Sequence, residues 1–145
     1  MKISTKGRYA IRMLLDLAEH QSDEYISLKD IAKRQGISKK YLEQIVPILN
    51  KSDILQTNRG FHGGYRLANS PEKYTLGMIL RLTEGSLAPV ACLGGDTNTC
   101  SRRSDCPTLY VWQDLYKLIN NYFDNITLQD IIDRNNKNLS DNYMI

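Results

Sequence analysis

The segment from Ser27 to Leu49 constrains the fold more than any other part of the chain, because it encodes two short helices separated by one glycine. Ser27 stands where a helix N-cap belongs, and Gly36 closes the helix that follows it. Ser38 caps the next helix, whose apolar residues recur at helical spacing. These inner-face residues are Leu42, Ile45, Val46 and Leu49. The pattern predicts a helix, a tight turn and a second helix.

Helical and strand patterns on either side complete this unit. Helical periodicity from Tyr9 to His20 predicts a preceding helix, and Thr75 is placed to cap a fourth one. Residues 54–56 and 65–67 have the pattern of two short strands, joined by a loop with three glycines. We therefore expect a mostly α protein, a winged helix-turn-helix with a two-stranded β wing, followed by a long C-terminal dimerisation helix.

The charge is divided unevenly along the 145 residues. Residues 1–66 hold twelve Lys or Arg against seven Asp or Glu, which gives +5, whereas residues 67–145 hold seven against nine, which gives −2. This asymmetry is typical of a polyanion-binding module joined to an oligomerisation or sensing half. A solvated basic surface without a partner is the alternative.

In a winged helix-turn-helix, the second helix of the pair enters the major groove of DNA and the hairpin tip contacts the backbone or the minor groove. Gln44 can pair with adenine, and Glu43 can accept a hydrogen bond from the cytosine amino group. Arg59, on the glycine-rich tip, can enter a narrow minor groove. If the module instead binds protein, these side chains are merely solvated. The predicted groove-facing residues are Ser38, Lys39, Lys40, Glu43 and Gln44.

All three cysteines, Cys92, Cys100 and Cys106, lie in one short segment. An odd number of clustered thiols does not make a disulfide scaffold. Three soft thiolates on a loop rich in Gly, Asn and Asp can converge on one metal centre. The chain has no Cys-x2-Cys pair, which weakens a structural zinc site. We expect these cysteines to hold an iron–sulfur cluster. One alternative is that the thiols are oxidised directly without a metal, and another is zinc or no metal.

After Pro107 an amphipathic pattern returns for about four turns, and its apolar stripe is too rich in aromatic residues to remain in water. It packs either on its own domain or on a second copy of the chain. Thr127 caps a short last helix, and the Asn-rich end is expected to be disordered. The predicted parts are 1–68 for DNA binding, 69–106 with the cysteine loop, 107–135 for dimerisation and 136–145 as the tail. The predicted dimer interface consists of Trp112, Leu115, Tyr116, Ile119, Tyr122 and Phe123.

Three motifs in the same order carry a family resemblance that extends over essentially the whole chain. They are the opening segment 2–10, the helix stretch 38–44, and Arg59-Gly60 with Gly63-Gly64-Tyr65. The chain resembles the bacterial winged-helix regulators that include IscR, NsrR and CymR. Membership implies a homodimer that binds a roughly palindromic DNA operator, with Glu43, Gln44 and Arg59 at the base-reading and wing positions. The predicted DNA-binding set also includes Tyr41, Gly60, His62 and Gly64.

The resemblance also implies a cofactor and a partner. IscR-like members hold an iron–sulfur cluster, here expected to be 2Fe-2S, on the three loop cysteines. Their fourth ligand, a His three residues after the third cysteine, is replaced by Leu109, and Arg8 stands where NsrR-like members have an acid, so the fourth ligand is unknown. The ending Tyr143, Met144 and Ile145 resembles that of the CymR-type branch, which suggests capture of the terminal isoleucine by cysteine synthase.

Taken together, the sequence predicts a dimeric, sequence-specific repressor that senses iron–sulfur or redox status and controls cluster-assembly or cysteine-metabolism genes. One alternative is a cluster-free cysteine-metabolism repressor acting with cysteine synthase. An alternative of another class is a small thiol or iron–sulfur redox protein. No nucleophilic constellation, P-loop or dinucleotide fingerprint supports an enzyme. The chain has neither a signal peptide nor a membrane-length apolar run, so a cytoplasmic protein is expected.

Overall fold

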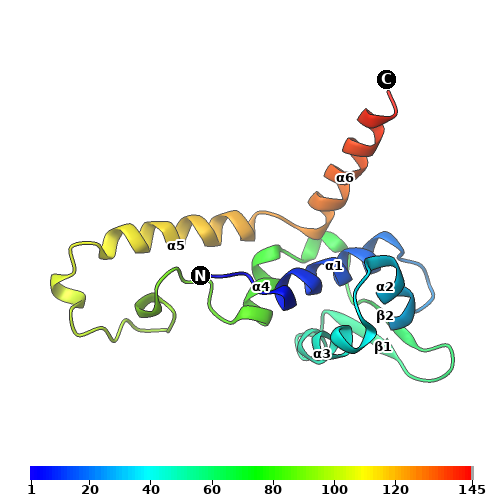
Figure 1. The fold of residues 1–145 in the computed structure, drawn as a ribbon, viewed down its shortest axis with the longest axis horizontal. Coiled ribbons are helices and arrows are strands. Elements are labelled where there is room, and N and C mark those ends of the chain that lie inside the picture. The colour runs from blue at the N-terminus through cyan, green and yellow to red at the C-terminus, as the bar shows by residue number, and fades with distance from the viewer. Residues whose placement is uncertain (145) are drawn as a thin grey trace.

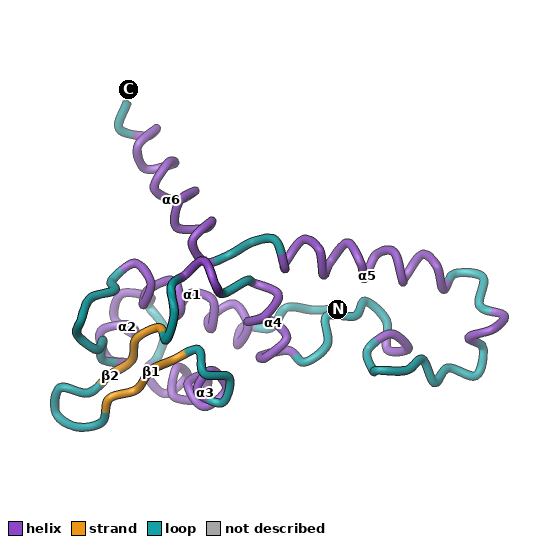
Figure 2. The backbone as a smooth tube through the Cα atoms, turned by 180° about the vertical axis from the view of Figure 1, so that it is seen from behind, coloured by secondary structure: helices purple, strands orange, loops and turns teal. Residues whose placement is uncertain are grey.

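The computed structural model describes residues 1–144 and consists of a body with two projections (Figures 1 and 2). The body contains α1 to α4 and the hairpin. The helix α5 extends away from it, with the cysteine loop at its far end, and α6 leaves the body in a different direction. Within residues 1–144, no helix is both long and apolar enough to cross a membrane.

Serine side chains begin the first three helices. The N-cap hydroxyls of Ser4, Ser27 and Ser38 each accept a hydrogen bond from a first-turn backbone N–H. The helix α2 ends at Gly36, whose φ of 60° lies in the left-handed region that glycine adopts without strain. The helices are α1 (Thr5–Glu19), α2 (Leu28–Gln35) and α3 (Lys39–Asn50), which confirms the predicted order.

The wing is an antiparallel hairpin of β1 (Leu55–Asn58) and β2 (Gly64–Leu67). Two hydrogen bonds of 2.8 and 2.9 Å also pair Tyr65 with Ile26, in the segment that leads into α2. Backbone hydrogen bonds therefore join the wing to the helix-turn-helix. The predicted winged helix-turn-helix fold with a two-stranded wing is confirmed.

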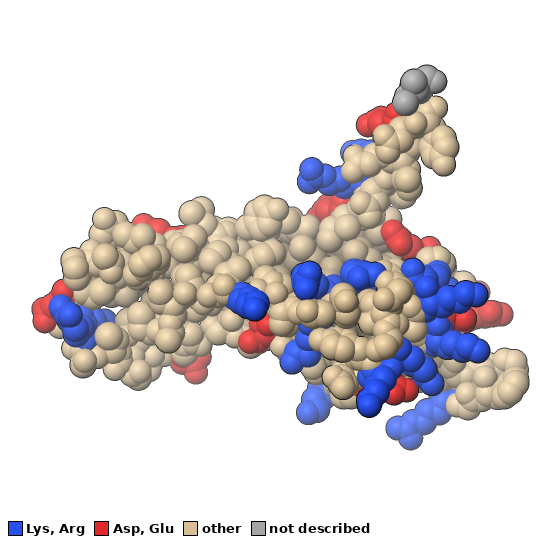
Figure 3. Space-filling view, viewed as in Figure 1, with Lys and Arg blue, Asp and Glu red and all other residues tan. Residues whose placement is uncertain are grey.

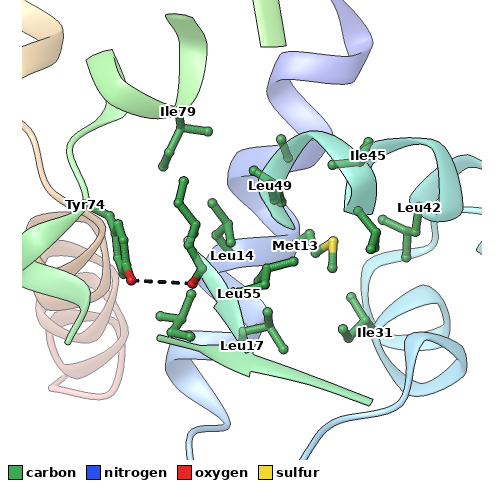
Figure 4. Packing of buried hydrophobic residues seen from close by; sticks show 14 of the residues in the cluster. Met13, Leu14, Leu17, Ile31, Leu42, Ile45, Leu49, Leu55, Tyr74 and Ile79 are labelled. Carbon is green, nitrogen blue, oxygen red and sulfur yellow. Dashed lines mark hydrogen bonds between the residues drawn. The ribbon is translucent and has the colours of Figure 1, made fainter. Parts of the chain in front are cut away.

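The core lies between α1, the inner face of α3 and the hairpin (Figure 4). Met13 and Leu14 of α1 are fully buried, and all four predicted inner-face residues of α3 are buried. The Tyr74 hydroxyl accepts a hydrogen bond from the Asn69 backbone N–H at 2.9 Å and donates to the Ile54 carbonyl at 3.4 Å. A phenol is thus accommodated in the apolar core because its oxygen has partners.

One charged group, Asp16 of α1, is also fully buried. Arg34 donates to its carboxylate through Nη2 at 2.7 Å and Nε at 3.0 Å, and the Gln35 amide donates at 2.9 Å. This hydrogen bonding raises the pKa of the Arg34 guanidinium above its ordinary value. A buried carboxylate is tolerated only with such compensation, so α2 is held on α1 in one orientation.

The remaining helices are α4 (Leu76–Glu84), α5 (Leu109–Asp124) and α6 (Leu128–Asn142), with short 3₁₀ turns at Pro71–Lys73, Ala91–Leu93 and Arg103–Asp105. Arg81 joins α4 to α5 through two 2.8 Å bonds to the Asp124 carboxylate and one of 2.7 Å to the Asn120 amide oxygen. The Arg81 hydrogen bond holds the pKa of the Asp124 carboxyl below its usual range. The base of the projecting α5 is therefore fixed to the body.

The predicted disorder of the tail is wrong for residues 136–142, because α6 continues to Asn142. A reciprocal capping box begins this helix: Asp130 accepts from the Thr127 backbone N–H at 2.8 Å, and the Thr127 hydroxyl accepts from the Asp130 N–H at 3.1 Å. Once nucleated, a helix extends at little cost per residue. Polar composition alone therefore did not indicate the end of the helix.

Replacement of Asp16 by Asn should lower the free energy of unfolding by about 2 kcal/mol, because the Arg34 guanidinium loses a charged bidentate partner. Urea denaturation measures this difference. The matched control is Asp23→Asn, at an exposed site, which should change stability by less than about 0.5 kcal/mol. Equal stability of the two variants would show that the buried ion pair does not hold α2 on α1.

Candidate nucleic-acid interface and cysteine loop

The outer edge of α3 is polar and open. Ser38, Lys39, Lys40, Glu43 and Gln44 are all exposed on the side opposite the buried face. The Lys39 ammonium lies 3.6 Å from the Glu43 carboxylate, and both side chains are more than half exposed. Such an exposed pair contributes little to stability, so either side chain is free to exchange its partner for a base edge or a phosphate.

The tip of the wing is a tight turn closed by a 3.0 Å hydrogen bond from the Gly63 N–H to the Gly60 carbonyl. Gly60 has a φ of 117°, a conformation that other residues rarely adopt. Arg59 precedes this turn and is exposed, as is His62 within it. Between the two lies Phe61, which is 98% exposed. The sequence analysis did not select Phe61, although an aromatic residue inside a glycine-rich tip was a visible signal.

A groove between the wing and the helix-turn-helix brings basic groups together. Lys29 of α2, Lys39 of α3 and Arg59 of the wing line it, together with backbone of Gly60 and Gly63. On the face of the molecule that Figure 3 draws, the Lys and Arg side chains are concentrated on the body, whereas α5 is largely uncharged. Lys29 was missed in the sequence because its position on α2 falls outside the recognition helix and wing.

Two residues of the predicted DNA-binding set have a different setting from the one expected. Tyr41 is half-buried, and its ring packs edge to face against Tyr9 with centroids 5.4 Å apart. Gly64 is buried, and a Cβ at this position would overlap the Ile26 carbonyl. Tyr41 therefore packs on α1 and Gly64 on the segment that leads into α2, and a contact of either residue with DNA stays a prediction.

The cysteine loop does not form a metal site in the conformation described. Cys100 is exposed, and Cys92 and Cys106 are half-buried. Within residues 1–144, no three His, Cys, Asp or Glu side chains lie together closely enough to hold a metal ion. The Thr108 hydroxyl, 3.7 Å from the Cys106 sulfur, lowers the pKa of that thiol by hydrogen bonding. The three thiols have the chemistry of cluster ligands, but convergence would require the loop to rearrange.

The apolar stripe of α5 is only partly covered within residues 1–144, where α4 packs against this helix. Every residue of Leu109–Asp124 is exposed or half-buried, which leaves the predicted interface open to a partner. Leu115 and Tyr122 are 38% and 65% exposed, and the other four predicted interface residues are half-buried. At the chain end, Tyr143 and Met144 are exposed, whereas Ile145 lies outside the described residues. Capture of this tail by cysteine synthase stays a prediction.

Comparison with known proteins identifies relatives along nearly the whole chain. Residues 3–134 match the family model described as "Rrf2: Iron-dependent Transcriptional regulator". The chain is 39% identical over 132 residues to Protein rrf2 of Nitratidesulfovibrio vulgaris, which covers 91% of this chain and 87% of that protein. It is 36% identical over 141 residues to the HTH-type transcriptional regulator IscR of Pectobacterium carotovorum, which covers 97% and 84% of the two chains.

Solved structures of similar proteins have the same fold. CymR, described as the global cysteine regulator of B. subtilis, superposes with a TM-score of 0.72 at 34% identity and covers 90% of this chain and 95% of its own. IscR of T. potens superposes with a TM-score of 0.70 at 36% identity, covering 92% and 88%. The IscR of Pectobacterium carotovorum and the CymR of B. subtilis are both named as regulators.

Gly64→Ala should weaken the wing, because the new methyl group would push β2 away from Ile26 and break the two backbone bonds between them. We expect a loss of about 1–3 kcal/mol in unfolding free energy. The matched control is Gly95→Ala, where the nearest atom to a new Cβ is the Thr97 carbonyl oxygen at 3.8 Å. Thermal melts of the two variants should differ, and identical melting would contradict the tight approach at Gly64.

Proposed function

The chain belongs to the Rrf2 family of transcriptional regulators, and from this premise we propose that it acts as a homodimeric repressor whose DNA binding responds to its three-cysteine loop. The observation that carries the proposal is the exposed edge of α3 beside the basic groove of the wing. Its proposed target genes are those of iron–sulfur cluster assembly or of cysteine metabolism. The first is supported by the three loop cysteines and the description of the family as iron-dependent, and the second by the similarity to CymR, described as a global cysteine regulator.

Each exposed group has a distinct task on DNA. Gln44 pairs with adenine and Glu43 accepts from cytosine, in the major groove, where base pairs present distinct donor and acceptor patterns. Lys39 and Lys40, with the α3 N-terminus at Ser38, hold phosphates and so fix the register. Arg59 enters the minor groove, where narrow A·T tracts concentrate negative potential.

Selection of binding sites from a random duplex library tests this function. The unmodified protein should enrich one roughly palindromic motif, with an affinity that falls steeply as salt rises because condensed counterions are released. Glu43→Ala should relax preference at one position per half-site, a loss of about 1–3 kcal/mol of discrimination, and Arg59→Ala should weaken binding. The control Asp141→Ala, on α6, should leave the motif unchanged. Failure to enrich any motif would refute the function.

The homodimer forms through α5, since a stripe with this many apolar side chains gains free energy when a second copy covers it. Two copies place two recognition helices on one duplex, and a palindromic operator matches that two-fold symmetry. Trp112, Leu115, Tyr116, Ile119, Tyr122 and Phe123 make this contact.

Ile119→Asp should produce monomers and lose operator binding at the same time, because a carboxylate would be buried in the apolar interface. Sedimentation at micromolar concentration measures the oligomeric state. Asn121→Asp adds the same charge to an exposed position of the same helix and should remain dimeric. A monomeric unmodified protein would rule out this assembly.

Cys92, Cys100 and Cys106 would hold the iron–sulfur cluster, because thiolates are the ligands such clusters take. When bound, the cluster supplies one-electron redox chemistry. The exposed loop allows oxidants to reach the sulfur atoms, and the loop leads directly into α5, so its state affects the dimer. Cys106 also supports a second candidate, in which the thiols themselves are oxidised without any metal, since a lowered thiol pKa increases the reactive thiolate.

Anaerobically purified protein should be brown, with iron and sulfide in stoichiometric amounts per chain. Replacement of any one of the three cysteines by Ser should remove the visible absorption, whereas Ser101→Ala, in the same loop, should retain it. Loss of the chromophore should also change which operators are bound. A colourless protein without iron after anaerobic reconstitution would contradict the cluster and leave thiol oxidation as the signal.

A further inference from the structure

Phe61 is the most exposed large apolar side chain in the described part of the molecule, at 98%. It lies in the loop between β1 and β2. This loop projects from the body (Figure 1). Burial of a Phe side chain is favourable, and at 98% exposure almost none of that gain is realised within residues 1–144. The wing tip therefore carries an apolar group that is open to contact with another molecule.

The turn fixes how Phe61 is presented. Phe61 and His62 are its two central residues, between Gly60 and Gly63, whose hydrogen bond closes it. A Cβ on Gly63 would lie 2.5 Å from the Asn58 carbonyl oxygen, so this close geometry requires glycine. The His62 ring meets the Phe61 ring edge to face, with centroids 5.0 Å apart. Because both flanks are constrained, the phenyl ring projects outward at the tip.

The charges around the tip select its ligand. Two hollows adjoin the wing and share Ser27, Asn58 and Gly63, so the turn of the wing borders both of them. One is the basic groove that holds Arg59. The other contains the carboxylates of Asp23, Glu24 and Asp30 together with Phe61 and His62. A polyanion is attracted to the Arg59 side and repelled from the carboxylate side, so it reaches Phe61, which borders the carboxylate hollow, from Arg59 across the exposed turn.

We propose that Phe61 is an apolar wedge that inserts from the minor groove between two adjacent base pairs, beside Arg59. This inference rests on the proposed DNA binding, and it adds to the direct reading of bases a specificity that depends on how easily the DNA deforms. Side chains such as Phe and Leu unstack a base step in this way and kink the duplex, most easily at flexible pyrimidine–purine steps. In a dimer the two wings insert at symmetric positions, so the operator should carry such a step next to the Arg59 contact in each half-site.

The test uses the full-length protein and the operator selected from the random library, labelled with 2-aminopurine at successive steps and with a donor–acceptor dye pair at its ends. The unmodified protein should raise 2-aminopurine fluorescence at one step per half-site and bring the dyes closer. Phe61→Ser should abolish both signals and weaken binding about tenfold or more. Phe61→Leu, which keeps an apolar wedge, should retain most of the bend.

Because the side chain is exposed, neither substitution should alter thermal stability, and equal melting temperatures will show that folding is intact. Unchanged affinity, fluorescence and bending with Phe61→Ser would overturn the wedge while leaving the proposed function in place. Failure of the unmodified protein to bind any duplex would instead overturn the proposed function, and the wedge with it.

Discussion

The buried carboxylate of Asp16 is the interaction on which the DNA-binding half depends. A charge in the apolar interior is costly unless strong donors surround it, and Arg34 and Gln35 at the end of α2 supply them. Because charged bidentate pairing is directional, it fixes how α2 lies on α1, whereas apolar packing alone would tolerate small rotations. The tight turn at Gly36 then transmits this orientation to α3 and its exposed edge.

The recognition surface is built from elements that constrain one another. Gly64 allows β2 to approach Ile26, which places the wing beside the N-terminus of α2. Lys29, Lys39 and Arg59 consequently line one groove although they come from three different elements. In the proposed complex, a surface of this kind would offer phosphate contacts across a continuous path, with α3 and the wing tip presenting different groups to the two grooves of DNA.

The cysteine loop is linked to the body at both ends. Before the loop, the Glu84 carboxylate accepts hydrogen bonds from the Ser4 hydroxyl at 2.6 Å and backbone N–H at 3.1 Å, at the start of α1. After it, α5 returns to the body, where Arg81 pairs with Asp124. Under the proposed function, a change in the loop would act on α1 through one end and on the α5 stripe through the other, which offers a physical route from thiol chemistry to DNA binding.

Local patterns in the sequence were sufficient to predict the helices and strands, since caps, apolar spacing and loop glycines act over a few residues. The order of the helices, the buried face of α3 and the wing were all predicted correctly. Proximity between distant residues was decided only by tertiary structure. The inward packing of Tyr41, the burial of Gly64 and the pairing of Asp16 depend on which segment lies opposite, information that periodicity does not contain. The polar composition of the chain end did not predict the length of α6, because a nucleated helix can extend through polar residues. Whether the three cysteines converge depends on the path of their loop, because a ligand set is a property of distances in space and not of spacing along the chain.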